Sequence, residues 1–308
     1  MPTGSGSCAK DPNSSIATCQ SEAAVQATIA LLLDTANFTL ALLLVTLGLV
    51  VIFGLMNVIN MAHGEFFLIG AYVVVAVSNA TGSFWLGLLL APLVLAVVGL
   101  LVEWLIIRHI YHRFIDTILA TWGLSLVIKQ GVVVLFGPGA QSVPNPLPTA
   151  VDVFGVQYPA YRLFIMALAA ALALATYYLF FRTKLGLQIR GVIANRAMAA
   201  SLGINTRRMD RATFAVGSAL AGFAGAVMAP IMSVDPQMGV GFLIPSFLSV
   251  LVGGVNSLVG ALIGSGVIGG ATTIFSAGIS QADAQILVFL LAMIIIRFLP
   301  SGIIGGRK

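Results

Sequence analysis

The chain has 308 residues and a formal net charge of +5; 59% of its residues are hydrophobic and only 8% are charged. Soluble domains have roughly a quarter of their residues charged, so this composition excludes a water-soluble protein. The apolar residues fall in runs of about twenty, the length at which a helix crosses a bilayer core. No polar linker separates these runs. We therefore predict a single all-α, polytopic membrane helix bundle.

Nine membrane spans are predicted. In chain order they cover residues 36–54, 62–78, 86–107, 116–136, 161–181, 212–232, 242–255, 258–277 and 283–299. Because their number is odd, the two ends of the chain are expected on opposite sides of the membrane. The spans form a predicted transmembrane domain over residues 26–300, and residues 301–308 are a predicted cytoplasmic tail.

The first 25 residues are interpreted as a polar extension outside the cytoplasm, because they lack the hydrophobic core of a signal peptide. Two states remain open for Cys8 and Cys19 in this extension: a disulfide in an oxidising compartment, or two free thiols. Segment 22–33 is either a helix lying at the outer surface or the beginning of a longer first span.

The positive charges are distributed unevenly. Of the 15 Lys and Arg residues, seven lie in segment 182–211, two end the chain, and none lies between Gly131 and Tyr161. Cytoplasmic loops of membrane proteins carry an excess of Lys and Arg. This pattern predicts a multi-pass inner-membrane protein with its N-terminus outside and its C-terminus inside. The Pro-rich segment 137–160 is then external, either as a docking place for a delivery protein or as a plain connector.

Polar or glycine residues interrupt the hydrophobic pattern at Asn57–Glu65 and at Gly253–Ser257. In lipid, broken helices persist only where they pack in protein or line a watery cavity, and such breaks in both halves of a transporter indicate a translocation path. Close helix packing is the expected main role of the glycines. If the first segment is helical, Asn57, Asn60 and His63 lie within about 120° of one another on one face.

A hydroxyl stripe is predicted on the fourth span, where Thr117, Thr121 and Ser125 recur every four residues within roughly 80° of arc. Hydroxyls and carboxamides both donate and accept hydrogen bonds, which suits a neutral solute with many hydrogen-bonding groups; holding helices together is the alternative role. The side chains predicted to line the solute path are Asn57, Asn60, His63, Glu65, Thr117, Thr121, Ser125 and Asn256.

Segment 182–211 is predicted to couple the protein to a cytoplasmic partner. Residues 192–202 are mostly strong helix formers, and Gly203 is a natural helix stop. A short helix with small surface residues and surrounding cations suits a groove on a partner; a solvated connector is the alternative. The residues expected to carry the coupling are Arg196, Ala199, Ala200, Gly203 and Arg207.

The sequence contains no G-x-x-x-x-G-K-[ST] loop for ATP phosphates and no Cys or His pattern with metal-ligand spacing. We therefore expect neither an enzyme nor a cofactor site in this chain. The stretch from Gly54 to Tyr72 (GLMNVINMAHGEFFLIGAY) closely resembles the signature of bacterial permeases for branched-chain amino acids and urea, as do Leu202–Ile204 and Ser246–Val255. The resemblance covers most of residues 36–300.

The resemblance implies the permease subunit of an ATP-binding-cassette importer. Its partners would be a second related permease chain, two cytoplasmic ATPases that bind ATP and Mg²⁺, and a periplasmic binding protein. Asp116–Leu126, Tyr161–Ile165 and the run from Asn195 to Ala200 are most similar to the urea branch, the Urt-type B subunit, which implies urea or a short amide as the substrate. The alternatives are a branched-chain amino acid permease and an ATP-independent solute channel.

Overall fold

The computed structural model describes residues 16–56, 58–110, 114–255 and 257–304. Asn57, Asn256 and Cys8 lie outside these residues, and the side chain of Cys19 is likewise not described. The described residues form eleven α-helices, one 3₁₀ turn and one β-hairpin: α1 (Ile16–Met56), α2 (His63–Thr81), α3 (Phe84–Leu105), η1 (Ile107–His109), α4 (Phe114–Phe136), β1 (Ala150–Val153), β2 (Val156–Pro159), α5 (Ala160–Arg182), α6 (Lys184–Ala194), α7 (Arg196–Ser201), α8 (Thr206–Met228), α9 (Met238–Gly253), α10 (Leu258–Gly278) and α11 (Gln281–Phe298).

Eight of these helices are long and apolar enough to cross a membrane: α1 to α5, α8, α10 and α11. The span predicted at 242–255 corresponds to α9, which is apolar but has only 16 residues. At about 1.5 Å per residue, α9 extends roughly 24 Å, less than the ~30 Å of a bilayer core. The all-α membrane bundle is therefore confirmed, with eight long helices and one shorter apolar helix in the described residues.

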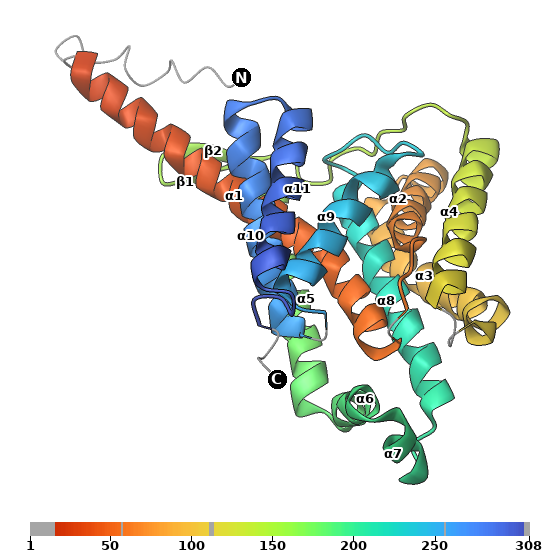
Figure 1. The fold of residues 1–308 in the computed structure, drawn as a ribbon. Helices are drawn as coiled ribbons and strands as arrows, with labels where there is room; N and C mark the ends of the chain where they lie inside the picture. Colours follow the sequence, from red (N-terminus) through yellow and green to blue (C-terminus); the bar gives the residue numbers. More distant parts are fainter. Residues whose placement is uncertain (1–15, 57, 111–113, 256, 305–308) are drawn as a thin grey trace.

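Helix α1 is a single element of 41 residues. Segment 22–33 therefore begins a longer first helix and is not a separate surface helix, and the helix also reaches into the part interpreted as a polar extension. The outer portion of α1 projects from the bundle, whereas its second half runs through the centre (Figure 1). There Leu42, Leu43 and Leu44 are completely buried on successive faces, as expected for a helix surrounded by others.

Helix α8 packs against α1, α2 and α3 and forms the middle of the bundle (Figure 1). Small residues make this close approach possible. A Cβ atom on Gly225 would lie 2.8 Å from the carbonyl carbon of Phe67 and 3.2 Å from the amide nitrogen of Ala71, both on α2. The backbone of α8 at Gly222 likewise lies directly against Gly70 of α2. The expectation that glycines serve packing is met at these crossings.

The connections gather at two ends of the bundle (Figure 1). One end carries segment 137–149, the hairpin β1–β2 and the turn between α10 and α11; we call it the outer end, following the predicted orientation. The opposite, inner end carries α6, α7 and the segment after α11. At the outer end, Gln141 and Val234 form an isolated antiparallel bridge that attaches segment 137–149 to the connection between α8 and α9.

The predicted single helix over 192–202 is wrong, because two helices, α6 and α7, divide this segment at Asn195. Asn195 has an extended backbone, and its side chain accepts a hydrogen bond of 3.0 Å from the backbone N–H of Met198. Such an N-cap ends one helix and starts the next. Gly203 follows α7 with a φ of +84°, a conformation that glycine adopts without strain and that agrees with its predicted role as a helix stop.

Candidate functional site

The connection between α1 and α2 lies inside the bundle. Val58, Asn60 and Ala62 are completely or almost completely buried. The segment from Val58 to Ala62 is not helical, so the condition for placing Asn60 and His63 on one helical face is not met. Side chains take over the role of missing helical hydrogen bonds: Asn60 Oδ1 accepts a bond of 3.1 Å from the backbone N–H of Ala62.

The predicted hydroxyl stripe of α4 lies against this connection. Thr117, Thr121 and Ser125 are all buried. Thr121 donates its hydroxyl proton to the carbonyl oxygen of Thr117 at 2.7 Å and accepts a bond of 3.1 Å from the backbone N–H of Met61. The stripe therefore satisfies the backbone of a broken helix, which is the interhelical role weighed as the alternative.

Glu65 is a buried carboxylate at the same place. Its Oε1 accepts a hydrogen bond of 3.0 Å from the hydroxyl of Ser125. Its Oε2 has no hydrogen-bond partner among the described residues, and a Cβ atom added to Gly239 of α9 would lie 3.2 Å from it. A buried acid with one unsatisfied oxygen is costly in an apolar bundle, which favours a functional role.

The His63 side chain is directed toward α1. Its Nε2 lies 3.1 Å from the carbonyl oxygen of Val45 on α1. Because a carbonyl only accepts, Nε2 carries the proton and Nδ1 is an acceptor, and Nδ1 has no partner in the described part of the chain. The structure thus brings Glu65, Thr121 and Ser125 together between α2 and α4, whereas it directs His63 toward α1. In this conformation the cluster is closed to solvent.

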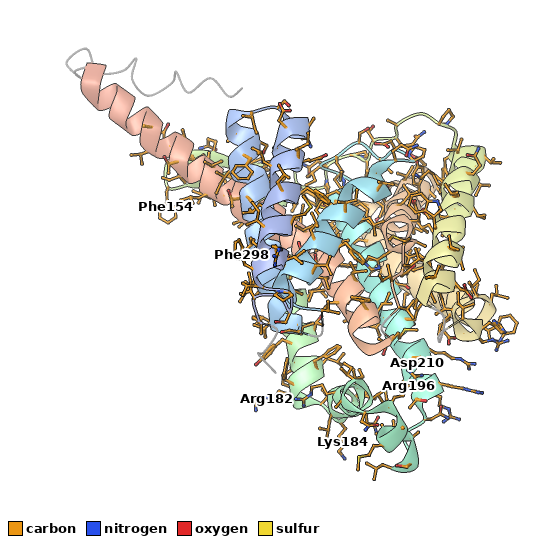
Figure 2. The ribbon with its side chains drawn as sticks, in the orientation of Figure 1. Phe154, Arg182, Lys184, Arg196, Asp210 and Phe298 are labelled. Atoms are coloured by element: carbon orange, nitrogen blue, oxygen red, sulfur yellow. The ribbon has the colours of Figure 1, made fainter. Side chains whose placement is uncertain are left out.

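Two ion pairs lie at the inner end: one connects the short helix α7 to α8, and the other connects α8 to α3. Arg196 of α7 binds Asp210 of α8 through both guanidinium nitrogens, one of them at 3.2 Å, and Asp210 is completely buried. Arg211 of α8 lies 3.3 Å from Glu103 of α3. Figure 2 shows Arg196 and Asp210 facing each other below the bundle. The α7 helix is therefore held to α8 by charge.

The residues predicted for coupling separate into two groups. Ala199 is buried and packs into the core, so a bulky residue there would disturb packing and not a docking surface. Ala200, Gly203 and Arg207 are exposed. Sequence reasoning missed Met198 and Leu202, which are 62% and 76% exposed. The two side chains are four residues apart, which places them on the same face of a helix. This spacing is the sequence feature that could have identified the apolar edge.

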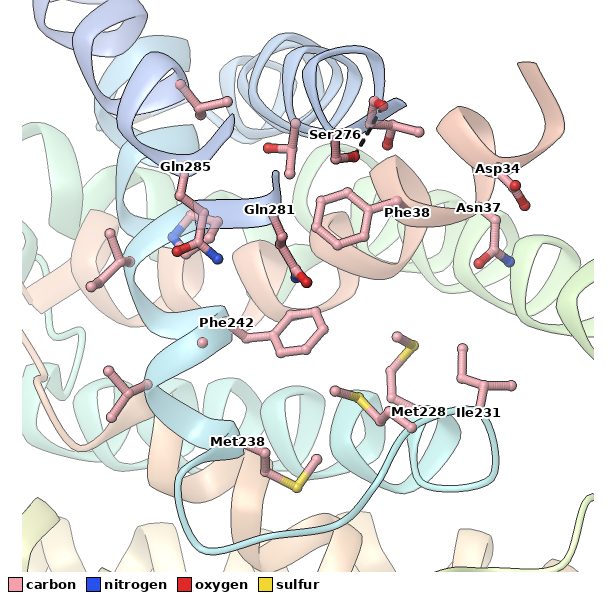
Figure 3. Close-up of a pocket in the computed structure, with 18 of the residues that line it drawn as sticks. Asp34, Asn37, Phe38, Met228, Ile231, Met238, Phe242, Ser276, Gln281 and Gln285 are labelled. Atoms are coloured by element: carbon pink, nitrogen blue, oxygen red, sulfur yellow. Dashed lines mark hydrogen bonds between the residues drawn. The ribbon is translucent and has the colours of Figure 1, made fainter. Parts of the chain in front are cut away.

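The outer end contains a cavity of about 980 Å³ that the sequence did not predict. It lies between α1, α5 and the last four helices, α8 to α11 (Figure 3). Its lining mixes three charged residues with amides, hydroxyls, methionines and phenylalanines. The cavity is assembled from helices that are distant in the sequence, so no short sequence motif identifies it. A polar residue within an apolar helix, such as Asn37 in α1, is the kind of sequence feature that could have indicated it.

An ion pair forms part of the cavity wall. Arg162 Nη1 of α5 lies 2.5 Å from Asp34 Oδ1 of α1, and both side chains are less than half exposed. Asp34 Oδ1 also accepts a bond of 3.0 Å from the hydroxyl of Tyr158 on β2. Burial raises the pKa of Tyr158 to about 12, so this hydroxyl stays protonated and donates at neutral pH. Asn37 donates to the carbonyl oxygen of Arg162 at 3.0 Å.

Comparisons with known proteins find relatives along most of the chain. A family model described as "Branched-chain amino acid transport system / permease component" matches residues 31–297. The high-affinity branched-chain amino acid transport system permease proteins LivH of Salmonella typhimurium and of Escherichia coli K12 are each 26% identical over 280 residues, 85% of this chain and 90% of theirs. BraD of Pseudomonas aeruginosa is 26% identical over 285 residues, 85% of this chain and 91% of BraD. No solved structure matches.

Proposed function

Since the chain belongs to the family of branched-chain amino acid transport permease components, we propose that it carries an aliphatic amino acid across the inner membrane as the permease subunit of an ATP-binding-cassette importer. The family match over residues 31–297 carries this proposal. The relatives of similar length are named for branched-chain amino acid transport. The cavity at the outer end supports the same substrate class, because its lining is both charged and apolar.

Urea, the substrate predicted from local sequence similarity, has no support among these relatives. The physical argument for urea was a set of neutral hydrogen-bonding side chains on the predicted path. In the structure, Thr121 already bonds to the backbone of the broken helix, and Ser125 bonds to Glu65. Their hydroxyls are therefore engaged within the protein in this conformation, which removes the main reason for preferring a small amide.

The partners follow from the family. Two ATPase subunits with ATP and Mg²⁺ would bind at the inner end, where Met198 and Leu202 form an exposed apolar edge on α7. A second permease chain and lipid would cover α4, α5 and α11, whose most apolar stretches are only 17–22% buried. A periplasmic binding protein would dock at the outer end, on segment 137–160. We propose the matching orientation, with the N-terminus outside and residues 182–211 in the cytoplasm.

The docking role of α7 has a direct test. Met198→Glu and Leu202→Glu each place a charge in an apolar contact, so we expect ATP-driven uptake to fall roughly tenfold or more while the permease remains in the membrane. Leu187→Glu on α6 is the matched control, since Leu187 is also exposed, at 64%. Normal uptake by both α7 variants would show that the ATPase binds elsewhere.

The substrate is tested with the importer purified with its partner subunits and binding protein. ATP hydrolysis is measured with leucine, urea and acetamide in turn. We expect leucine to stimulate hydrolysis and the two amides to leave it at the basal rate. Stimulation by urea and not by leucine would reject the proposed substrate. Solute flux without any ATPase subunit would instead indicate a channel.

A further inference from the structure

Resting on the proposed function, we propose that the outer cavity is a binding chamber for a zwitterionic aliphatic amino acid. Arg162 would hold the carboxylate of the solute, and the acceptor groups on α10 and the acidic side chains would hold its ammonium group. The cavity is large enough, at about 980 Å³, since pockets for small ligands measure ≈ 300–1,000 Å³.

The α10 wall consists of hydroxyl groups that can only accept further hydrogen bonds. Thr272 donates its proton to the carbonyl oxygen of Ile268 at 2.7 Å, and Thr273 donates to that of Gly269 at 3.1 Å. Ser276 donates to the carbonyl oxygen of Thr273 at 3.1 Å. Because each hydroxyl proton is used within the helix, only the oxygen lone pairs remain for a solute. This wall favours a group with several donors, such as an ammonium.

Charged side chains also line the chamber, a cation beside two acids. Arg162 uses Nη1 for Asp34, and its side chain is 40% exposed, so a planar carboxylate can approach its other donors. Asp235 is the third charged residue of the lining. Two carboxylates against one guanidinium leave a net negative charge. The chamber therefore suits a zwitterion and disfavours a simple anion.

An apolar surface completes the chamber. Met228, Met232 and Met238 line the chamber, and Phe38 and Phe242 lie next to each other in its wall, with ring centroids 6.4 Å apart (Figure 3). Thioether side chains adapt to irregular shapes, so this surface accommodates differently branched aliphatic chains. Urea has no apolar part to bury here, which distinguishes the two substrate classes.

Occupancy of the chamber is tested by thiol protection. Ser276→Cys is introduced into a chain whose Cys8 and Cys19 are replaced by serine, and the assembled importer is treated with an impermeant thiol reagent from outside. We expect leucine to slow the modification and urea to leave its rate unchanged. Val25→Cys is the control, because Val25 is 55% exposed on the outer portion of α1, which projects from the bundle (Figure 1) and does not line the cavity.

Charge recognition is tested by substitution. Arg162→Gln should raise KM for leucine roughly tenfold or more, because it removes a hydrogen bond to a charged group. The same variant should raise the uptake of isoamylamine relative to that of leucine, because isoamylamine is leucine without the carboxylate. Arg108→Gln at the inner end, where Arg108 lies over the ring of Trp104, should leave KM unchanged.

The two proposals fail in different ways. If the parent importer transports leucine, but leucine neither protects Ser276→Cys nor depends on Arg162, then the chamber is not the binding site and the proposed function stands. If the parent neither transports leucine nor hydrolyses ATP in response to it, the proposed function is rejected and this inference with it. Protection of Ser276→Cys by urea in place of leucine would overturn the assignment of the chamber.

Discussion

The ion pair between Arg196 and Asp210 offers the sharpest test of how α7 is held. Arg196→Gln leaves the carboxylate of Asp210, which is completely buried, without its cation. Removing one partner of a buried pair costs about 3–5 kcal/mol. The Arg196 side chain is 40% exposed, so solvent screens part of the pair and we expect about 2–3 kcal/mol.

The assay is thermal unfolding of the purified importer together with its uptake rate. A loss of this size should lower Tm by roughly 5 °C or more and release α7 from α8, so that ATP hydrolysis no longer drives uptake. The double variant Arg196→Gln/Asp210→Asn removes the charge from both partners of this pair and should recover most of the lost stability. A wild-type Tm for the single variant, or no recovery in the double variant, would refute this reasoning.

Two further predictions concern the bundle itself. Gly225→Ala should destabilise the protein by about 1–3 kcal/mol through overpacking against Phe67, whereas Gly123→Ala, whose Cβ would meet nothing within 4 Å, should leave Tm unchanged or raise it; equal Tm values for the two variants would contradict the close crossing of α2 and α8. Ser125→Ala removes the hydrogen bond to Glu65 and should cost about 1–3 kcal/mol, measured as a lower Tm; an unchanged Tm would show that Glu65 does not depend on Ser125.

Local patterns were sufficient for much of the architecture. Runs of apolar residues predicted the position and order of the eight long helices, although the ninth predicted span is the shorter helix α9, and Gly203 was identified as a helix stop from its type alone. Asn195 was read inside a helix because the propensities around it are helical. Its side chain instead caps α7 by accepting a single hydrogen bond from the backbone N–H of Met198. Propensity summed over a window cannot detect such a break.

Only part of the candidate site could be predicted from the sequence. The spacing of Thr121 and Ser125 predicted one hydroxyl stripe, and both side chains are buried on α4 in the structure. His63 and Glu65 point to different helices because they are two residues apart on α2, which separates them by about 200° around its axis. The helical angle predicted for Asn60 and His63 does not apply, because the connection before α2 is not helical. The outer cavity combines Arg162 with residues more than a hundred positions away, such as Ser276. Only the tertiary fold brings these residues together.

The central claim is that this chain moves an aliphatic amino acid inward at the expense of ATP. The most direct measurement is the accumulation of labelled leucine in proteoliposomes that contain the complete importer and are supplied with ATP on the ATPase side and binding protein on the other. We predict accumulation above the external concentration that stops when the ATPase subunits are omitted. Accumulation of urea without leucine, or leucine uptake that only equilibrates and needs no ATPase, would contradict the claim.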